Sequence, residues 1–315
     1  MFITVIYEED VMQLKKSFIF VSNKKSDLKQ KYKSRALFVD KKLSNLPNNL
    51  YSLTFYNSYN QKLENLPNNL KVINFGMNFD QKIENLPSGL KKLTFDYNFN
   101  QKLENLPDGL QTLTLGRRFN NKLENLPDSL HTLNFHVISK FNQKLENLPP
   151  NLHTLKLGQR FNQKLENLPN SLRNLRLSWA FNRKLENLPR GLKKLTLGYS
   201  FNRNLRNLPY GLKKMTTGWF FSKKLQRLPS SIKYLTTGWF FNDSLNICIA
   251  LPYLKKLTVS EFYKKKIPIL FDVSINVGSS GDGDEVSKSY KINKKKYKKY
   301  SVDEWKSVFN EILCY

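Results

Sequence analysis

Cysteine is scarce in this chain of 315 residues, which has only Cys248 and Cys314, far apart in the sequence. Two cysteines so far apart exclude a disulfide framework, and their spacing is not that of metal ligands. This low cysteine content is typical of proteins in a reducing compartment. Long apolar runs are lacking as well, because no segment approaches the roughly 18 apolar residues of a membrane helix. The first twenty residues carry Glu8, Glu9 and Asp10 and do not resemble a secretory signal. We therefore expect an intracellular, cytoplasmic protein with no membrane contact.

Acidic residues are few: 25 Asp and Glu stand against 52 Lys and Arg, giving a net charge of +27. Such a charge favours acidic partners, namely nucleic acid, an anionic surface or an acidic protein. The histidines are limited to His131, His136 and His153, and no third ligand is evident beside any pair of them. A phosphate-binding glycine loop and a tuned acid/base pair are also lacking. We expect no enzyme activity, no metal and no cofactor.

A Leu-Pro dipeptide recurs every 20 residues, with a single step of 22. Its prolines are Pro47, Pro67, Pro87, Pro107, Pro127, Pro149, Pro169, Pro189, Pro209 and Pro229. A degenerate copy surrounds Pro252, and the unit reads FNxKLENLPxxLxxLTLGxx, as at residues 181–200. Ten copies in register predict a repeat solenoid, in which each unit stacks on the next.

Each position of the unit recurs in every copy, and we call the set of equivalent residues a column. The residue types in these columns predict the conformation of the unit. Leu192, Leu195 and Leu197 follow an LxxLxL spacing that places the last two on one face of a short strand. Pro189 opposes a helix in the return segment, and Gly198 suggests a turn after the strand. One unit cannot cover its own apolar side, so neighbouring strands must stack about 4.8 Å apart. We expect a leucine-rich-repeat-like horseshoe with a parallel sheet on its concave face and an extended or 3-10 convex side.

Polar columns accompany the leucines. An asparagine follows the repeated phenylalanine at Asn60, Asn100, Asn120, Asn142, Asn162, Asn182, Asn202 and Asn242, with Asp80 and Ser222 as departures. These amides either satisfy turn backbone groups between rungs or form a polar binding stripe, and we favour the first interpretation. The Lys column that starts at Lys62 and the Glu column that starts at Glu64 are interpreted as a solvated edge.

The paired FN and LP signatures, with LxxLxL between them, resemble the FNIP repeats of social amoebae and giant viruses, a branch of the leucine-rich repeats. The resemblance covers residues 43–259. It implies a horseshoe solenoid and, in members with an F-box before the repeats, substrate capture for a ubiquitin ligase. Residues 1–40 lack the Leu-Pro opening and helical leucine spacing of an F-box, so we predict an N-terminal cap at 1–42. Cys248 has no nearby acid suited to the cysteine-dependent ligases of similar bacterial effectors, and we interpret it as a core residue.

The chain after the repeats is no longer periodic. We predict a capping segment at 260–285, with a buried strand at 267–275 followed by an acidic loop. A Lys- and Tyr-rich arm follows at 286–300, and an amphipathic helix at 301–315 opens on a capping box. The arm is a solvated segment, a nucleic-acid contact or a nuclear-import signal. The sequence does not define the oligomeric state.

Aromatic and basic side chains accumulate together in the later copies. The candidate partner-binding residues are Arg176, Trp179, Lys194, Tyr199, Lys214, Trp219 and Trp239. Aromatic anchors beside cations are typical of protein–protein hot spots, which favours a protein-interaction scaffold or adaptor. Two alternatives stay open: stacking on single-stranded nucleic acid or binding of another polyanion, and mutual packing of the aromatics without a ligand.

Two polar residues interrupt the inward strand column. Thr217 and Thr237 stand where other copies have Leu or Phe. Buried hydroxyl groups need hydrogen-bond partners. The sequence leaves two explanations, a core that narrows towards its end or an irregular stretch of the repeat.

Overall fold

The computed structural model describes residues 46, 48, 50–55, 57–260 and 262–265, together with the backbone of 36–39, 274–277 and 288–291. These residues form one fourteen-stranded sheet whose strands follow chain order. The strands are β1 (Ala36–Val39), β2 (Ser52–Phe55), β3 (Val72–Asn74), β4 (Lys92–Thr94), β5 (Thr112–Leu115), β6 (Thr132–Phe135), β7 (Thr154–Lys156), β8 (Asn174–Arg176), β9 (Lys194–Thr196), β10 (Lys214–Thr216), β11 (Tyr234–Thr236), β12 (Lys256–Val259), β13 (Ser274–Val277) and β14 (Lys288–Lys291).

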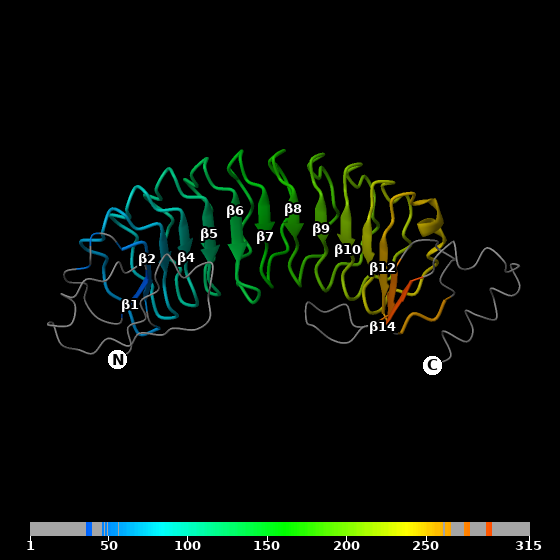
Figure 1. Ribbon diagram of the computed structural model, residues 1–315, viewed down its shortest axis with the longest axis horizontal. Helices are drawn as coiled ribbons and strands as arrows, with labels where there is room; N and C mark the ends of the chain where they lie inside the picture. The colour runs from blue at the N-terminus through cyan, green and yellow to red at the C-terminus, as the bar shows by residue number, and fades with distance from the viewer. Residues whose placement is uncertain are drawn as a thin grey trace, which may run out of the picture.

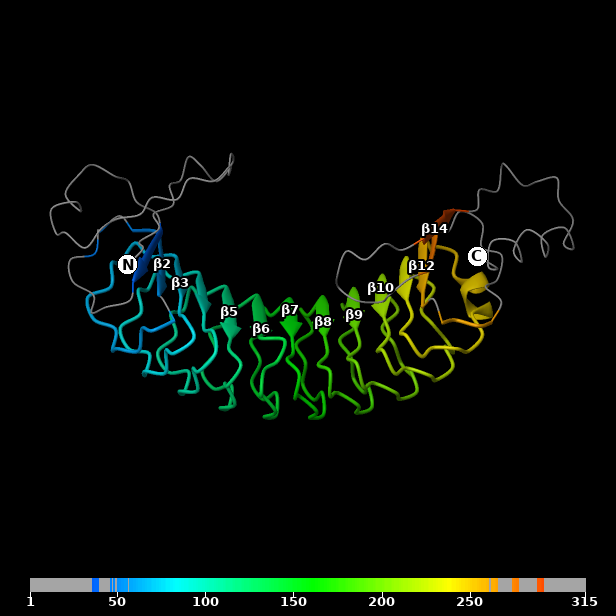
Figure 2. The same ribbon diagram turned by 90° about the horizontal axis from the view of Figure 1, so that it is seen from below.

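The strands stack as successive rungs of an arch (Figure 1). Pairing is parallel from β1 to β13, and Leu155, Leu175 and Leu195 face each other across neighbouring strands. Figure 2 shows that the strands line the concave side and the return segments the convex side. The predicted horseshoe solenoid is confirmed.

Each rung places one aromatic ring in a continuous buried stack, which we call the phenylalanine spine. Its members are Tyr59, Phe79, Phe99, Phe119, Phe141, Phe161, Phe181, Phe201, Phe221, Phe241 and Tyr263. Neighbouring ring centroids lie 6.0 to 6.3 Å apart with their planes nearly parallel. Offset stacking adds to the apolar burial of each ring, so the spine couples every rung to the next.

The spacing of the rings explains the curvature of the arch. Phe55 ends β2, and Phe75 and Phe95 directly follow β3 and β4, with ring centroids 4.9 and 5.1 Å apart. Directly behind them, Phe99 of the spine lies 3.7 Å from Phe95. Because the spine spacing exceeds the strand spacing by about 1 Å, each rung is a wedge, and a stack of wedges bends with its strands inside.

The asparagine of ENLP turns the chain at the end of each return segment. The residues with positive φ, between 54° and 56°, are Asn65, Asn85, Asn105, Asn125, Asn147, Asn167, Asn187, Asn207 and Arg227. Asparagine tolerates this left-handed conformation better than other residues with a Cβ atom. Arg227 is therefore the strained member of the series.

The asparagine after the spine residue links one rung to the next. The N–H of Asn182 donates to Oδ1 of Asn162 at 3.0 Å, and the N–H of Asn162 donates to Oδ1 of Asn142 at 2.8 Å. The same bond recurs with Asp80, whose carboxylate accepts the N–H of Asn100 at 2.8 Å. These side chains satisfy backbone donors in the turns, which confirms the structural interpretation of the column.

Gly198 is needed for a close approach of two rungs. Its φ is not positive, but a Cβ atom built on it would lie 1.4 Å from the carbonyl oxygen of Ser178. Gly238 approaches the carbonyl oxygen of Gly218 in the same way. The glycine after the strand therefore allows neighbouring turns to pack in contact.

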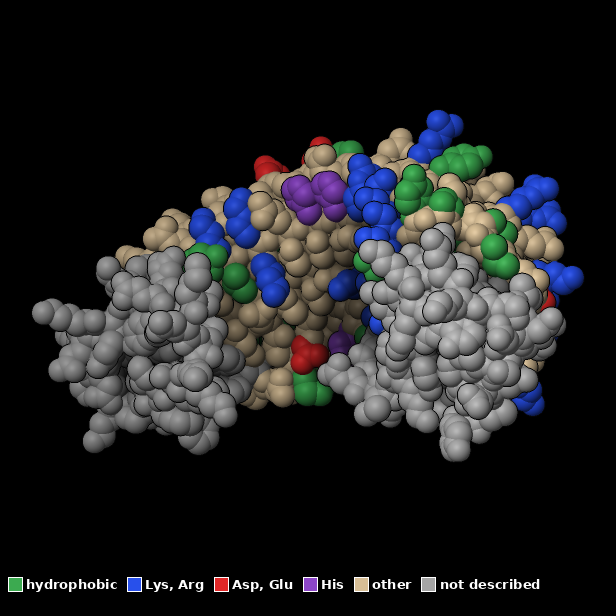
Figure 3. All heavy atoms as spheres, turned by 45° about the vertical axis from the view of Figure 1, so that its right-hand side comes forward, with side chains coloured by type: hydrophobic (Ala, Val, Ile, Leu, Met, Phe, Trp, Pro, Cys, Tyr) green, Lys and Arg blue, Asp and Glu red, His purple; other side chains and the backbone are tan. Residues whose placement is uncertain are grey.

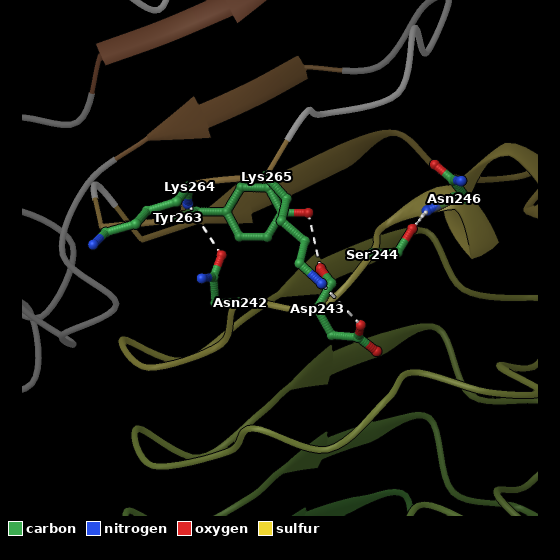
Figure 4. Close-up of polar contacts among 7 residues, drawn as sticks. All are labelled: Asn242, Asp243, Ser244, Asn246, Tyr263, Lys264 and Lys265. Carbon is green, nitrogen blue, oxygen red and sulfur yellow. Dashed lines mark hydrogen bonds and ion pairs between the residues drawn. The ribbon is translucent and has the colours of Figure 1, made fainter.

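The end of the repeat region is closed by a short 3-10 helix, η3 (Asn246–Ala250), which buries Cys248. Figure 4 shows the polar contacts beside it: the Tyr263 hydroxyl donates to the Asp243 carbonyl oxygen at 2.9 Å, and Lys265 pairs with the Asp243 carboxylate at 3.3 Å. Burial raises the pKa of the Cys248 thiol to about 12. The thiol therefore stays protonated and serves the core, as predicted.

Both ends of the sheet extend beyond the repeats. β1 lies within the segment predicted as a cap at 1–42, and β13 meets only the end of the strand predicted at 267–275. β14 lies in the arm predicted at 286–300 and pairs antiparallel with β13. The predicted acidic loop and the predicted helix at 301–315 lie outside the described residues.

Candidate binding surfaces

An aromatic rim follows the carboxyl ends of strands β8 to β12. It consists of Trp179, Tyr199, Trp219, Phe220, Trp239, Phe240 and Phe262. Tyr199 and Trp239 stack on the two sides of Trp219, with ring centroids 4.7 and 4.8 Å away. These separations match the spacing of the strands, so the repeat itself brings the rings into contact.

The aromatic rim is stacked and still accessible. The exposed fraction of Trp179 is 46% and that of Phe240 is 53%, while Tyr199, Trp219 and Trp239 are half-buried. Because Tyr199, Trp219 and Trp239 already cover one another's faces, a ligand would meet mainly their edges. This geometry suits a broad apolar contact rather than insertion of a flat group between the rings.

The backbone below the aromatic rim is fixed from rung to rung. The N–H of Phe220 donates to the carbonyl oxygen of Tyr199, and the N–H of Phe240 donates to that of Trp219, both at 3.0 Å. A preorganised backbone lowers the entropy lost when a partner binds.

The three predicted cations lie on the strands and not on the rim. Arg176 ends β8, while Lys194 and Lys214 open β9 and β10 and face each other across the sheet. Arg176, Lys194 and Lys156 also line a shallow hollow of about 350 Å³ on the concave face. The structure thus separates the predicted site into an aromatic rim and a basic concave face.

A second basic surface lies at the amino ends of the strands, and the candidates named from the sequence include only two of its residues, Lys194 and Lys214. We call it the basic strip: Arg173, Lys193, Lys194, Lys213, Lys214, Lys233, Lys255 and Lys256. It continues the column in which His131 and His153 stack, with ring centroids 5.1 Å apart. Figure 3 shows two adjacent histidines on this edge with Lys and Arg side chains gathered beside them. The signal in the sequence was the Lys-Lys pair that precedes the strand residues Leu195, Met215 and Leu257.

The two threonines of the inward column are satisfied by the neighbouring rung. The hydroxyl of Thr217 accepts the N–H of Gly238 at 2.7 Å, and the hydroxyl of Thr237 donates to the carbonyl oxygen of Thr258 at 3.4 Å. Thr216, Thr236 and Thr258 stay in register on β10 to β12. The repeat is thus regular in these two rungs. Thr217 and Thr237 simply replace the larger apolar residues that other copies have at this inward position.

The remaining charged columns are exposed. Lys122 lies 4.0 Å from Glu124 and Lys164 lies 3.7 Å from Glu166, with all four side chains well over half accessible. Among the described residues no group of three His, Cys, Asp or Glu could hold a metal ion. In the same part of the chain, no helix has the length and apolar character needed to cross a membrane.

Comparison with known proteins gives the family. The FNIP Repeat family matches the chain at residues 41–78, 59–98, 79–105, 99–137, 141–179 and 181–218. Among solved structures, the chain is similar to the giant-virus protein CroV588, described as a novel circular LRR protein structure, with 42% identity and a TM-score of 0.64.

That similarity covers 69% of this chain and 34% of CroV588, so the chain spans about a third of that protein's length. A search of curated proteins finds no match. The family matches extend over more than half of the residues, and they coincide with rungs that carry the phenylalanine spine and the asparagine turns. The chain therefore belongs to the FNIP-repeat family.

Proposed function

We propose that the chain is a non-catalytic scaffold that binds another protein through the aromatic rim. Repeat folds of this type are generally non-enzymatic scaffolds that bind proteins. The observation that carries the proposal is the stack from Trp179 to Trp239, which leaves large aromatic side chains accessible on a rigid backbone. Tryptophan and tyrosine dominate the energetics of protein interfaces because they bury much area at low entropic cost.

The chemistry of the aromatic rim defines the partner. Phe220 and Phe240 stack at 5.1 Å and are both exposed, so they extend the apolar surface beyond the tryptophans. Arg203 and Lys223 follow in the adjoining segments, which favours a partner with apolar side chains bordered by acids. A role as adaptor for a ubiquitin ligase stays a prediction from the family resemblance.

Affinity capture with paired variants tests this proposal. A partner recovered with the wild-type chain should be lost with the Trp219→Ala, Trp239→Ala double variant, because hot-spot aromatics each contribute about 2 kcal/mol or more. The matched control is Tyr210→Ala, which removes an exposed aromatic from the opposite edge of the sheet. Equal recovery with both variants would exclude the aromatic rim as the binding surface.

A further inference from the structure

The basic strip lies on the edge of the sheet opposite the aromatic rim. Its outer column, which includes Lys193 and Lys213, precedes the strands, whereas the rim follows them, so a whole strand separates the two surfaces. Its inner column lies on the strands, where Lys194 faces Lys214 and Tyr234 faces Lys256. The strip therefore follows the rungs along the arch, apart from the aromatic rim, and it shares Lys194 and Lys214 with the concave face.

Like charges repeat along the outer column of the basic strip, at Arg173, Lys193, Lys213, Lys233 and Lys255. From residue 173 to residue 265 the sequence has nineteen Lys and Arg and three Asp and Glu. Of these acids, Glu186 lies in the return segment, and Asp243 is paired with Lys265 near η3. Cations on adjacent rungs lie about 4.8 Å apart at the backbone, well within the Debye length at physiological salt. A ligand with regularly spaced negative charge would relieve this repulsion.

Exposed tyrosines alternate with these cations. The exposed fraction is 93% for Tyr210 and 61% for Tyr253, which lie in the turns before β10 and β12, and 41% for Tyr234 on β11. The Lys193 ammonium lies over the turn that holds Tyr210, because a Cβ atom built on Gly211 would lie 2.8 Å from its Nζ. A cation therefore lies beside the turn that carries the exposed Tyr210 side chain.

We propose that the basic strip binds single-stranded nucleic acid, with phosphates on the lysine columns and bases against Tyr210 and Tyr253. Backbone-tracking cations with aromatic stacking platforms form the usual combination for single strands, whose unpaired bases can stack. The five rungs from Arg173 to Lys255 extend about 19 Å, room for on the order of four nucleotides. This site is independent of the aromatic rim and of its protein partner.

Fluorescence anisotropy with a labelled 12-nucleotide oligothymidylate tests the proposal on the full chain. The Lys193→Glu, Lys213→Glu, Lys233→Glu variant should weaken binding at least tenfold. Because three phosphate contacts are lost, the log–log dependence of affinity on salt should become shallower by about 2. Tyr210→Ala should weaken binding about five- to tenfold with the salt dependence unchanged, since it removes stacking alone.

The matched control reverses three exposed lysines of the convex side, Lys122, Lys144 and Lys164, and so changes the net charge by the same amount. It should retain oligonucleotide affinity within about threefold. Equal losses in both triple variants would show that net charge alone attracts the probe, and they would overturn the proposal. So would absence of binding, equal affinity of polyphosphate with no effect of Tyr210→Ala, or preference for phosphatidylserine vesicles over the oligonucleotide.

Discussion

Replacement of Asn162 by alanine would remove one side-chain acceptor from the middle of the arch. The Oδ1 of Asn162 accepts the N–H of Asn182 at 3.0 Å, and both residues are half-buried between rungs. The neighbouring bond, from the N–H of Asn162 to Asn142, would stay intact because it uses the backbone of residue 162. The change therefore isolates a single inter-rung hydrogen bond.

The expected loss in the free energy of unfolding follows from the N–H of Asn182, which would have no acceptor in the variant. A buried N–H without a partner costs about 1 to 3 kcal/mol, and the partial exposure of Asn182 places the expected loss at about 1 to 2 kcal/mol. Asn162→Asp is the matched control, because a carboxylate at this position accepts the same type of bond in the rung of Asp80. Its loss should stay below about 0.5 kcal/mol.

Two measurements check this expectation. Urea unfolding followed by circular dichroism gives the change in the free energy of unfolding, and amide hydrogen exchange gives the protection of Asn182 itself. Asn162→Ala should raise the exchange rate at Asn182 more than at the amides of distant rungs. Unchanged protection at Asn182, or an equal loss of stability in Asn162→Asp, would refute the role of the asparagine column.

Three further predictions concern stability. Phe161→Ala should lower the free energy of unfolding by about 3 to 5 kcal/mol in urea, because its fully buried ring stacks on both neighbours of the phenylalanine spine; a loss below 1 kcal/mol would contradict this. Arg227→Asn should raise the same free energy by about 1 kcal/mol, since it relieves a left-handed arginine; no gain would argue against strain there. Burial, with Cys248 and Asp243 nearby, raises the pKa of Tyr263 from 10.0 to about 12, so its contribution is complete below pH 10 and is lost as the pH rises towards 12; Tyr263→Phe should flatten this part of an alkaline unfolding curve.

The repeat fold could be predicted because the same pattern of leucine, proline and asparagine recurs in ten copies of the unit. The alternation at Leu195 and Leu197, together with the proline of the return segment, was sufficient to place strand, turn and convex side. The asparagine column was also readable, since short amides next to turns commonly bond to backbone groups. A strict period turns weak local preferences into a strong joint constraint.

The binding surfaces were predicted less well, for two physical reasons. Residues close in sequence, such as Lys213 and Trp219, point to opposite edges of the sheet once a strand lies between them. The contact of Gly198 with Ser178 joins residues that are far apart in the chain, so the sequence suggested a turn rather than a close approach. The hydroxyl partner of Thr217 likewise comes from the next rung. Such contacts depend on how rungs meet, which a single copy does not reveal.

The wedge shape of each rung fixes how far the molecule turns per repeat. Within a rung, the ring centroids of Phe95 and Phe99 lie 3.7 Å apart. Between rungs, the spacing on the spine side exceeds the spacing on the strand side by about 1 Å. The ratio of these two lengths gives the angle between neighbouring rungs, and a full circle would take on the order of twenty rungs. Repeat number alone therefore sets the angle that the protein subtends. Duplication or deletion of a 20-residue unit would lengthen or shorten the arc while its radius stays constant, so evolution can adjust the span between the two ends without redesigning a single contact.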